Sequence, residues 1–440
     1  MAASPQTPEI SETPKTGAPL TGLEPASAHS WGAPLRISAF RLLCITQLAT
    51  GLRMPMIFVT QAWYVNTVAP DGQRVLLLGL LATLRGSVFL LYVVFGGAFA
   101  DRYPRRAMLL ISHASAWAAT LLIGGLLFLP GASEGQGAWL WVMFALFTSF
   151  ELINAQDLPT RNAMIADIVP PSMLTSAVTI FSMAMPVSML VGAPLTGVLL
   201  DRVGFGTMYL ISGIGHIVLI LAVWPMRAGE RAADPDATHA SVFANVRVGI
   251  HRLRTDPVVR WIVLASWVSF TVGMSVMGLL VAAWVSEILE LDASGWGVMM
   301  VFWGVGGLLA SGVLSLQGEF GHKGLLYLAA LFVFGVAVTG FGFSRILILA
   351  FLFNGLAGAM HQWIRILSTA SLQHVVPNRI LGRVMALLIL SQGISQAFGI
   401  AIGALGQLIG LEVLYPAAGL TIMGLTFVLA AWQRPLRKLD

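Results

Sequence analysis

The chain has 440 residues, 57% of them hydrophobic and only 10% charged, and its 25 Lys and Arg residues outnumber its 20 Asp and Glu residues. Soluble globular proteins carry about 25% charged residues, so this composition, with a mean hydropathy of +0.82, excludes a water-soluble enzyme and a disordered protein. An outer-membrane β-barrel is also excluded, because its strands would alternate polar and apolar residues, which leaves an all-α polytopic membrane protein.

Residues 1–35 are rich in Pro, Ser, Thr, Ala and Gly and lack the apolar run that forms the core of a signal peptide. We therefore expect a disordered cytoplasmic tail there. Cys44 is the only cysteine of the chain, and a single thiol forms neither an intramolecular disulfide nor a Cys-based metal cluster. The sequence predicts no metal and no cofactor.

Twelve apolar segments follow, and each is long enough to cross a membrane at about 20 residues per span. They lie at about residues 37–66, 75–100, 106–129, 138–158, 172–200, 206–226, 259–285, 295–316, 324–343, 346–369, 380–409 and 412–432. Six segments precede a polar stretch and six follow it, so we predict two pseudo-symmetric six-helix bundles. The expected domains are an N-terminal bundle at 36–226, a linker at 227–258, a C-terminal bundle at 259–433 and a cytoplasmic tail at 434–440.

The distribution of Lys and Arg orients these segments. If the N-terminus is placed inside and the sides alternate, the outside loops hold only Arg74, Arg202 and Arg345, and a few more arginines lie within spans. All other Lys and Arg residues fall on the inside, as the positive-inside rule describes. We therefore expect both termini in the cytoplasm, and the basic excess needs no nucleic-acid partner.

The linker contains apolar residues at helical spacing, opposite Arg247 and Arg254. The apolar positions are Val242, Phe243, Val246, Ile250 and Leu253. This spacing predicts an amphipathic helix. The helix lies either on the inner membrane surface or in solvent as a connector between the bundles.

The two halves resemble each other in sequence. The Val-Pro pair at 169–170, followed by Leu174, recurs 207 positions later at 376–377, followed by Leu381. Paired halves of this kind are typical of transporters whose substrate site lies between the halves, near the bilayer midplane.

Ionisable residues inside membrane spans are costly to bury and therefore mark functional sites. Arg53 lies in the first span, Arg85 in the second and Glu151 in the fourth. Because Glu151 is the only carboxylate near the middle of a span, it can alternate between a protonated form and an Arg-paired form. We predict that Glu151, with Arg53 or Arg85 as its partner, couples transport to protons. A static buried ion pair that fixes helix packing is the alternative.

His361 and Arg365 lie four residues apart in the tenth span, hence on one helix face. The excess of arginine over glutamate inside the spans favours an anionic or zwitterionic substrate. We expect Arg365, beside His361, to contact the anionic group; alternatively, its side chain extends to the inner interface. His113 and His216 are expected to be packing histidines on peripheral spans.

The first inside loop carries a motif defined by Gly97, Asp101, Arg102, Arg105 and Arg106. It resembles the signature loop between spans two and three of the major facilitator superfamily. Physically, the glycine permits close helix approach and the arginines anchor the turn at the inner face. The resemblance implies the fold of that superfamily, a monomer, and a loop that braces the outward-open state. It also implies that a carboxylate near the inner end of span four pairs with this loop, and Asp157 is the candidate.

Two further stretches resemble the enterobactin-exporter-like, transmembrane secretion effector branch of the superfamily. They are residues 154–163 with the Val-Pro pair at 169–170, and residues 372–385 in the second half. The resemblance covers roughly residues 36–433. The second-half equivalent of the signature loop, at 312–323, lacks an Asp-Arg pair, so we expect an asymmetric gate. Members of this branch export siderophores and drugs, mostly in exchange for protons.

In the superfamily, spans one, four, seven and ten line a central cavity, so the resemblance places four of the charged and titratable residues on it. These are Arg53, Glu151, His361 and Arg365. Aromatic residues on the same spans are predicted to stack on a hydrophobic cargo, the alternative being that they serve as packing or interface anchors. They are Trp63, Phe150, Trp267, Phe270 and Trp363.

These features predict a secondary active transporter in a bacterial-type inner membrane. We expect it to export a small amphipathic or anionic molecule, of the siderophore or drug class, in exchange for protons by alternating access. The alternatives are a lipid or lysolipid flippase on the same fold, a membrane enzyme and a sensor. An enzyme is disfavoured because the sequence holds no nucleophile–base constellation, metal-spaced histidine cluster or phosphate-binding loop.

Overall fold

The computed structural model describes residues 32–100, 103–226, 242–317 and 321–437, and every regular element within these ranges is a helix. The N-terminal half contains α1 (Ser38–Val68), α2 (Arg74–Ala100), α3 (Arg105–Leu126), α4 (Trp139–Asn154), α5 (Asp157–Ile168) and α6 (Leu174–Val223). The C-terminal half contains α7 (Val242–Thr255), α8 (Pro257–Ser269), a π-helical turn (Phe270–Met274), α9 (Ser275–Met277), α10 (Val281–Glu287), α11 (Ala293–Gln317), α12 (Lys323–Phe343), α13 (Leu347–Val375), α14 (Asn378–Ala397), α15 (Gly399–Ile409), α16 (Leu411–Trp432) and α17 (Arg434–Arg437).

The described residues account for the twelve predicted crossings. Ten helical segments are long and apolar enough to cross a membrane. One of them, Pro171–Val223, has 53 residues, about twice the length of a single span. It contains two crossings, because Gly204 interrupts the helical backbone with a φ of 73°, a conformation that favours glycine. The remaining crossing is made by α4 and α5, which are too short to qualify singly.

The contacts of α6 show that the chain reverses at Gly204. Before this residue, Gly192 lies against Gly51 and Leu52 of α1; after it, Gly206 lies against Gly124 of α3. Small residues at these crossings let the backbones approach closely, as is common between membrane helices. The first half of α6 therefore packs along α1 and the second half along α3.

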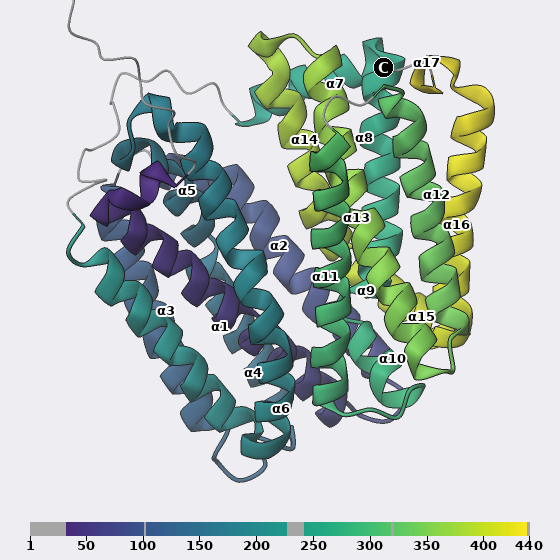
Figure 1. The fold of residues 1–440 in the computed structure, drawn as a ribbon. Coiled ribbons are helices and arrows are strands. Elements are labelled where there is room, and N and C mark those ends of the chain that lie inside the picture. The colour runs from purple at the N-terminus through teal and green to yellow at the C-terminus, as the bar shows by residue number, and fades with distance from the viewer. Residues whose placement is uncertain (1–31, 101–102, 227–241, 318–320, 438–440) are drawn as a thin grey trace, which may run out of the picture.

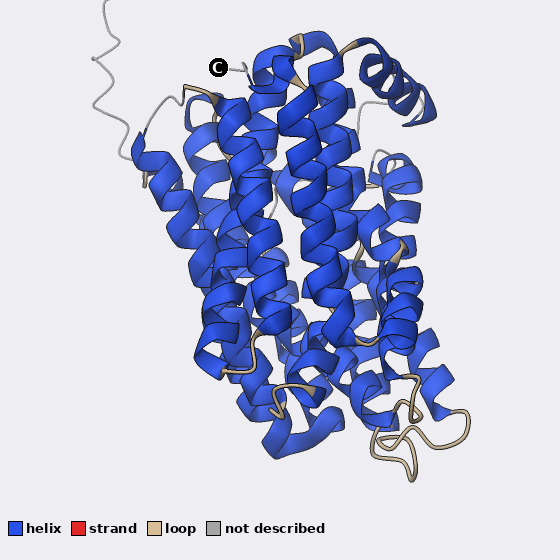
Figure 2. Cartoon of the chain, turned by 90° about the vertical axis from the view of Figure 1, so that its right-hand side faces the viewer, coloured by secondary structure: helices blue, strands red, loops and turns tan. Residues whose placement is uncertain are grey.

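The helices form two groups that are joined at one end of the molecule (Figure 1). We name the two ends by their contents. The linker end holds α5, α7 and α17, at the top of Figure 1, and the far end holds the end of α1 and the junction of α10 with α11. In the perpendicular view, the long helices run between these ends with short connections (Figure 2).

Three helix pairs join the halves, namely α2 with α14, α2 with α15 and α6 with α11, and glycines allow them to pack tightly. A Cβ atom on Gly79 of α2 would lie 2.4 Å from the carbonyl oxygen of Gly399 in α15, and one on Gly197 of α6 would lie 2.4 Å from the carbonyl oxygen of Ala293 in α11. These contacts are to backbone atoms, which cannot move aside as a flexible side chain can. Any larger residue at Gly79 or Gly197 would therefore separate the halves.

The sequence repeat has a structural counterpart in both halves. Val169 follows α5 and Val376 follows α13, and both adopt an extended conformation directly before a proline. This is expected, because proline disfavours the helical conformation of the residue that precedes it. The repeat thus marks the same break between successive crossings in each half.

The predicted linker helix is present as α7. A Cβ atom on Gly249 of α7 would lie 3.0 Å from the carbonyl oxygen of Arg383 in α14. The helix α7 therefore packs on the C-terminal half. Arg247, Ile250 and Arg254 are exposed on it. The side chains of the apolar residues predicted at 242–246 are not among those that the structure describes. The tail at 1–31 and the linker residues 227–241 lie outside the described ranges.

Candidate functional site

A cavity of about 440 Å³ lies between the two halves, in the middle of the molecule. Its walls come from α1, α6, α9, α11 and α13 and from the π-helical turn, so both halves contribute. Six methionines line it, namely Met185, Met189, Met274, Met277, Met299 and Met300. Three aromatic residues also line it, namely Phe58, Trp296 and Trp303. Methionine side chains are flexible and polarisable, so this wall can adapt to apolar ligands of different shapes.

His361 and Arg365 lie on this cavity, as their spacing on one face of α13 predicted. The His361 ring packs edge-on against Phe270, with 5.0 Å between centroids, and 5.5 Å from Trp303. Its Nδ1 atom is buried and has no hydrogen-bond partner among the described residues. Arg365 is exposed, and no ion pair within the described ranges includes it. The cavity therefore offers an imidazole and an unpaired guanidinium on an otherwise apolar wall.

The structure places most of the predicted cavity aromatics elsewhere. Trp267 donates a hydrogen bond from Nε1 to the carbonyl of Leu387, and Trp363 donates one to Ala310, both at 2.8 Å. Trp63 packs against the Trp296 ring that itself lines the cavity.

Among the described residues, Trp63, Trp267, Phe270 and Trp363 do not line the 440 Å³ cavity. One physical reason lies in the seventh crossing. The π-helical turn Phe270–Met274 adds residues to one turn and rotates the helix face that follows it. Met274 in this turn and Met277 directly after it line the cavity.

A second, smaller cavity of about 180 Å³ lies in the N-terminal half and shares Met185 with the first. Its walls hold the four residues predicted as a charge network together with Phe150, the remaining predicted aromatic. The network residues are Arg53, Arg85, Glu151 and Asp157. The two cavities thus adjoin, and the charged side chains gather on the smaller one.

Glu151 of α4 pairs with Arg85 of α2. The Glu151 Oε1 atom lies 2.8 Å from Arg85 Nη2, and their side chains are 21% and 12% exposed. Arg85 also donates from Nη1 to Gln61 Oε1 at 3.1 Å and lies 5.0 Å from the centroid of the Phe58 ring, a cation–π distance. Of the two partners predicted for Glu151, the described contacts therefore select Arg85. Both residues of the pair line the smaller cavity.

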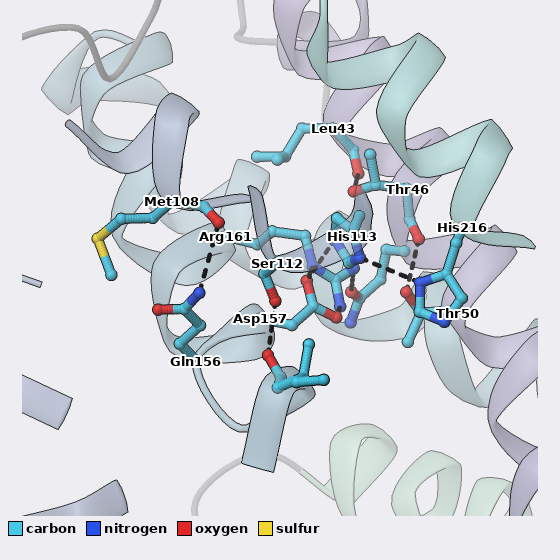
Figure 3. A network of polar contacts seen from close by, with 12 residues as sticks. Leu43, Thr46, Thr50, Met108, Ser112, His113, Gln156, Asp157, Arg161 and His216 are labelled. Carbon is cyan, nitrogen blue, oxygen red and sulfur yellow. Dashed lines mark hydrogen bonds and ion pairs between the residues drawn. The ribbon is translucent and has the colours of Figure 1, made fainter. Parts of the chain in front are cut away.

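Asp157 lies at the centre of a buried polar network at the start of α5 (Figure 3). Arg161, one turn later, donates to both carboxylate oxygens, from Nε at 2.7 Å and from Nη2 at 2.6 Å. Arg161 Nη1 also donates to Gln47 Oε1 at 2.6 Å. His113 Nε2 lies 3.1 Å from Asp157 Oδ1, and His113 Nδ1 lies 3.3 Å from His216 Nδ1. His113 and His216 thus belong to this network and are more than the packing histidines that the sequence suggested.

The signature loop makes contacts within the N-terminal half. Arg105 Nη1 lies 2.7 Å from Asp167 Oδ2, and Arg106 donates to the carbonyl of Trp224. The resemblance implied that Asp157 pairs with this loop, but the described partners of Asp157 are Arg161 and His113. The loop residues Asp101 and Arg102 lie outside the described residues. Gly97 lies within α2, where its surroundings are likewise not described.

At the far end, polar contacts close the halves against each other. Arg74 Nη1 lies 2.8 Å from Glu287 Oε1, and the backbone N–H of Ser294 donates to Asp201 Oδ2 at 2.9 Å. Ser294 also donates from its hydroxyl to Asp292, and this hydrogen bond lowers the pKa of the Asp292 carboxyl below its usual range. Within the described residues, the hydrogen bonds between the halves lie at the far end or midway along α2. The cavities are therefore closed on the far side.

Comparison with known proteins identifies related sequences and folds. Residues 28–440 match the family described as transmembrane secretion effector. The staphyloferrin A transporter of Staphylococcus aureus is 23% identical over 376 residues, which are 85% of this chain and 91% of that protein.

Solved structures of transporters share the fold. A nucleoside transporter NupG mutant superimposes with a TM-score of 0.73 at 11% identity, over 90% of this chain and 100% of the other. A peptide transporter POT mutant bound to alafosfalin gives 0.72 at 14% identity, over 92% and 96%. A D-xylose–proton symporter gives 0.67 at 14% identity, over 90% and 97%. Each of these similarities extends over at least 90% of this chain and therefore concerns the fold as a whole.

Proposed function

Because this chain belongs to the transmembrane secretion effector family, we propose that it is a proton-coupled exporter of small amphipathic anions. It is a secondary transporter of the major facilitator type and not an enzyme. The observation that supports the finer proposal is a pair of adjoining cavities, the larger between the halves and the smaller within the N-terminal half. One is wide and apolar with a free guanidinium, and the other holds a carboxylate–arginine pair.

The substrate class follows from the chemistry of the larger cavity. Its methionine and tryptophan walls favour an apolar body, and Arg365 favours an anionic or zwitterionic group. A volume of about 440 Å³ lies within the range of small-molecule sites. The family relative named for staphyloferrin A supports a siderophore or drug-like cargo.

The orientation follows from the basic residues. The Lys and Arg residues outside the spans concentrate toward the linker end, so this end and both termini lie in the cytoplasm of a bacterial-type inner membrane. The chain acts as a monomer in the lipid bilayer. The Arg74–Glu287 pair joins the halves at the far end, which supports an inward-facing state that accepts substrate from the cytoplasm.

Coupling uses the Glu151–Arg85 pair. Protonation of Glu151 removes the charge that holds Arg85, which frees the guanidinium to reorient or to bind an anion. Deprotonation restores the pair. A carboxylate that alternates between these two forms exchanges one proton for each change of state, which is the requirement for antiport.

Replacing Arg365 with Ala is expected to weaken transport of acidic compounds selectively. Because Arg365 is exposed, loss of its charge contact with the substrate should cost about 1 kcal/mol or less, which would raise KM for an acidic substrate by about three- to fivefold. The KM for a neutral analogue of equal size should stay close to that of the wild type. Efflux of the two compounds from proteoliposomes gives both numbers, and an equal loss for both would show that Arg365 serves packing or the interface.

Replacing Gly197 with Leu is expected to open the far end. The new side chain would collide with the backbone of Ala293, and a penalty of about 1 kcal/mol would shift the population of open molecules roughly fivefold. A cysteine at Asn66, in a Cys44→Ser background, would then react about fivefold faster with an impermeant maleimide added from the far side. Gly125→Leu is the matched control, because a Cβ there meets nothing within 4 Å; similar labelling in both variants would contradict the closed far end.

A further inference from the structure

We propose that Arg53 is the residue that binds the substrate's carboxylate, inside the smaller cavity, and that Asn154 receives a hydrogen bond from a donor group next to that carboxylate. This inference rests on the proposed function for the existence of a substrate. It goes beyond it by assigning a binding site and a ligand chemistry.

The charges on the smaller cavity do not balance. Three arginines line it, Arg53, Arg85 and Arg161, against two carboxylates, Glu151 and Asp157. Both carboxylates are already bound. Glu151 pairs with Arg85, and Asp157 binds Arg161 through two hydrogen bonds. Arg53 is the third guanidinium: it interacts electrostatically with Asp157 and Glu151, but no ion pair among the described residues includes it, and the cavity keeps an excess of one positive charge.

The guanidinium of Arg53 is buried. Arg53 is only 6% exposed, and no hydrogen bond or ion pair among the described residues includes it. Its Nε atom is buried and unpartnered. A buried guanidinium without a partner is destabilising, so a protein keeps one only if something binds there. An anion in this cavity would satisfy Arg53 in surroundings where charge-assisted hydrogen bonds are strong.

Both crossings of α6 pack close to Arg53 on α1. A Cβ atom on Gly215 of α6 would lie 2.9 Å from Cδ of Arg53, so the glycine provides the room for the arginine stem. At Gly51, two residues earlier on α1, a Cβ would lie 2.5 Å from the carbonyl oxygen of Met185. Met185 precedes and Gly215 follows the reversal at Gly204, so both crossings of α6 contact α1 near Arg53, which lines the smaller cavity.

Asn154 lines the same cavity. Its Nδ2 atom donates to the carbonyl of Phe150 at 2.8 Å, which fixes the orientation of the amide. Its Oδ1 atom is consequently an acceptor, and it is buried without a partner. The cavity thus presents an unsatisfied cation and an unsatisfied acceptor, which together match a carboxylate that carries a hydroxyl or N–H group nearby.

The size of the site fits this division. A volume of about 180 Å³ accommodates the polar head of a molecule, and Met185 is common to both cavities. The apolar body of the same molecule can therefore extend past Met185 into the methionine-lined cavity. Arg365, in contrast, is exposed, so water and salt screen it and it discriminates less between an acid and a neutral compound.

The test measures binding to the purified full-length protein in detergent by titration calorimetry. The probes are 2-hydroxy-4-phenylbutanoate, the corresponding primary amide, and 4-phenylbutanoate, which lacks the hydroxyl. The wild type should bind the hydroxy acid at least about tenfold more tightly than the amide. Arg53→Gln should abolish this preference, whereas Arg365→Gln should keep most of it. Asn154→Ala should abolish the preference for the hydroxy acid over 4-phenylbutanoate.

The melting temperature of the ligand-free protein separates binding from a structural role. Arg53→Met should leave it unchanged or raise it, because the substitution removes an unpaired buried charge. A lower melting temperature would mean that Arg53 stabilises the fold through contacts of its own, and it would overturn the proposal. So would a wild type that does not bind the hydroxy acid, or an Arg53→Gln variant that retains the preference for acid over amide.

Failure of this inference can be told apart from failure of the proposed function. If Arg53 determines acid binding but the acid is not exported from proteoliposomes under a proton gradient, the site stands and the exporter does not. If the acid is exported and Arg53→Gln binds it as the wild type does, the exporter stands and the site assignment fails.

Discussion

Substitution of Glu151 with Gln should abolish proton-driven transport and leave substrate exchange intact. Glutamine has nearly the shape of protonated glutamate but cannot release a proton, so the site remains in one state and Arg85 loses its counter-ion. In proteoliposomes, accumulation driven by a pH gradient should fall to the level seen without a gradient, a loss of about 100-fold in initial rate if chemistry through Glu151 is the only coupled route. Counterflow, in which labelled substrate exchanges for unlabelled substrate without net proton movement, should continue at a rate within about threefold of the wild type.

Two controls define this result. Glu151→Asp keeps the titratable carboxyl and should retain gradient-driven transport at a reduced rate. Glu287→Gln removes a carboxylate from the Arg74–Glu287 pair at the far end, whose partners are each about a third exposed, and should retain coupling. Undiminished gradient-driven transport by Glu151→Gln would show that the Glu151–Arg85 pair is a static contact.

The pairing of Glu151 could be predicted only in part from the sequence. A carboxylate in the middle of a span requires a counter-charge, and the sequence contains two candidates on neighbouring spans. The selection of Arg85 over Arg53 depends on how α1, α2 and α4 rotate about their axes. Periodicity cannot supply this rotation when a helix is apolar on all sides. Hence the sequence predicted that an ion pair exists, and the structure was required to identify it.

The fold was more accessible than the site for a related reason. Hydropathy reports how many segments are long enough to cross a membrane, and each of the twelve expected segments has a helical counterpart among the described residues. It does not report which face of a segment meets the cavity, so Trp267 and Trp363 were predicted on the right helices but lie on the wrong faces. It also gave no signal for the contact between His113 and His216, which lie 103 residues apart on α3 and α6.

Substitution of Asp157 with Asn should cause the largest loss of stability of any single change considered. The side chain of Arg161 is fully buried, and Asp157 provides both of its carboxylate contacts. Removing one partner of a buried ion pair typically costs about 3–5 kcal/mol, because the remaining charge stays buried without compensation. Here Arg53 borders the same cavity, so two uncompensated guanidinium groups would face each other. The melting temperature of the purified variant, and its free energy of unfolding in denaturing detergent, measure the effect.

The matched comparison is Asp167→Asn, which makes the same substitution in the Arg105–Asp167 pair. That pair has nearly the same separation, 2.7 Å, but its side chains are 33% and 34% exposed. Water can solvate Arg105 when its partner is lost, so the cost should not exceed about 1 kcal/mol. The double variant Asp157→Asn/Arg161→Gln should recover part of the stability that Asp157→Asn loses, because it removes the uncompensated charge. Equal losses for Asp157→Asn and Asp167→Asn, or no recovery in the double variant, would contradict a dominant electrostatic role for Asp157. The two pairs have the same chemistry and nearly the same distance, and they differ mainly in burial. Either result would therefore mean that Asp157 stabilises the fold through the shape of its side chain and not through its charge.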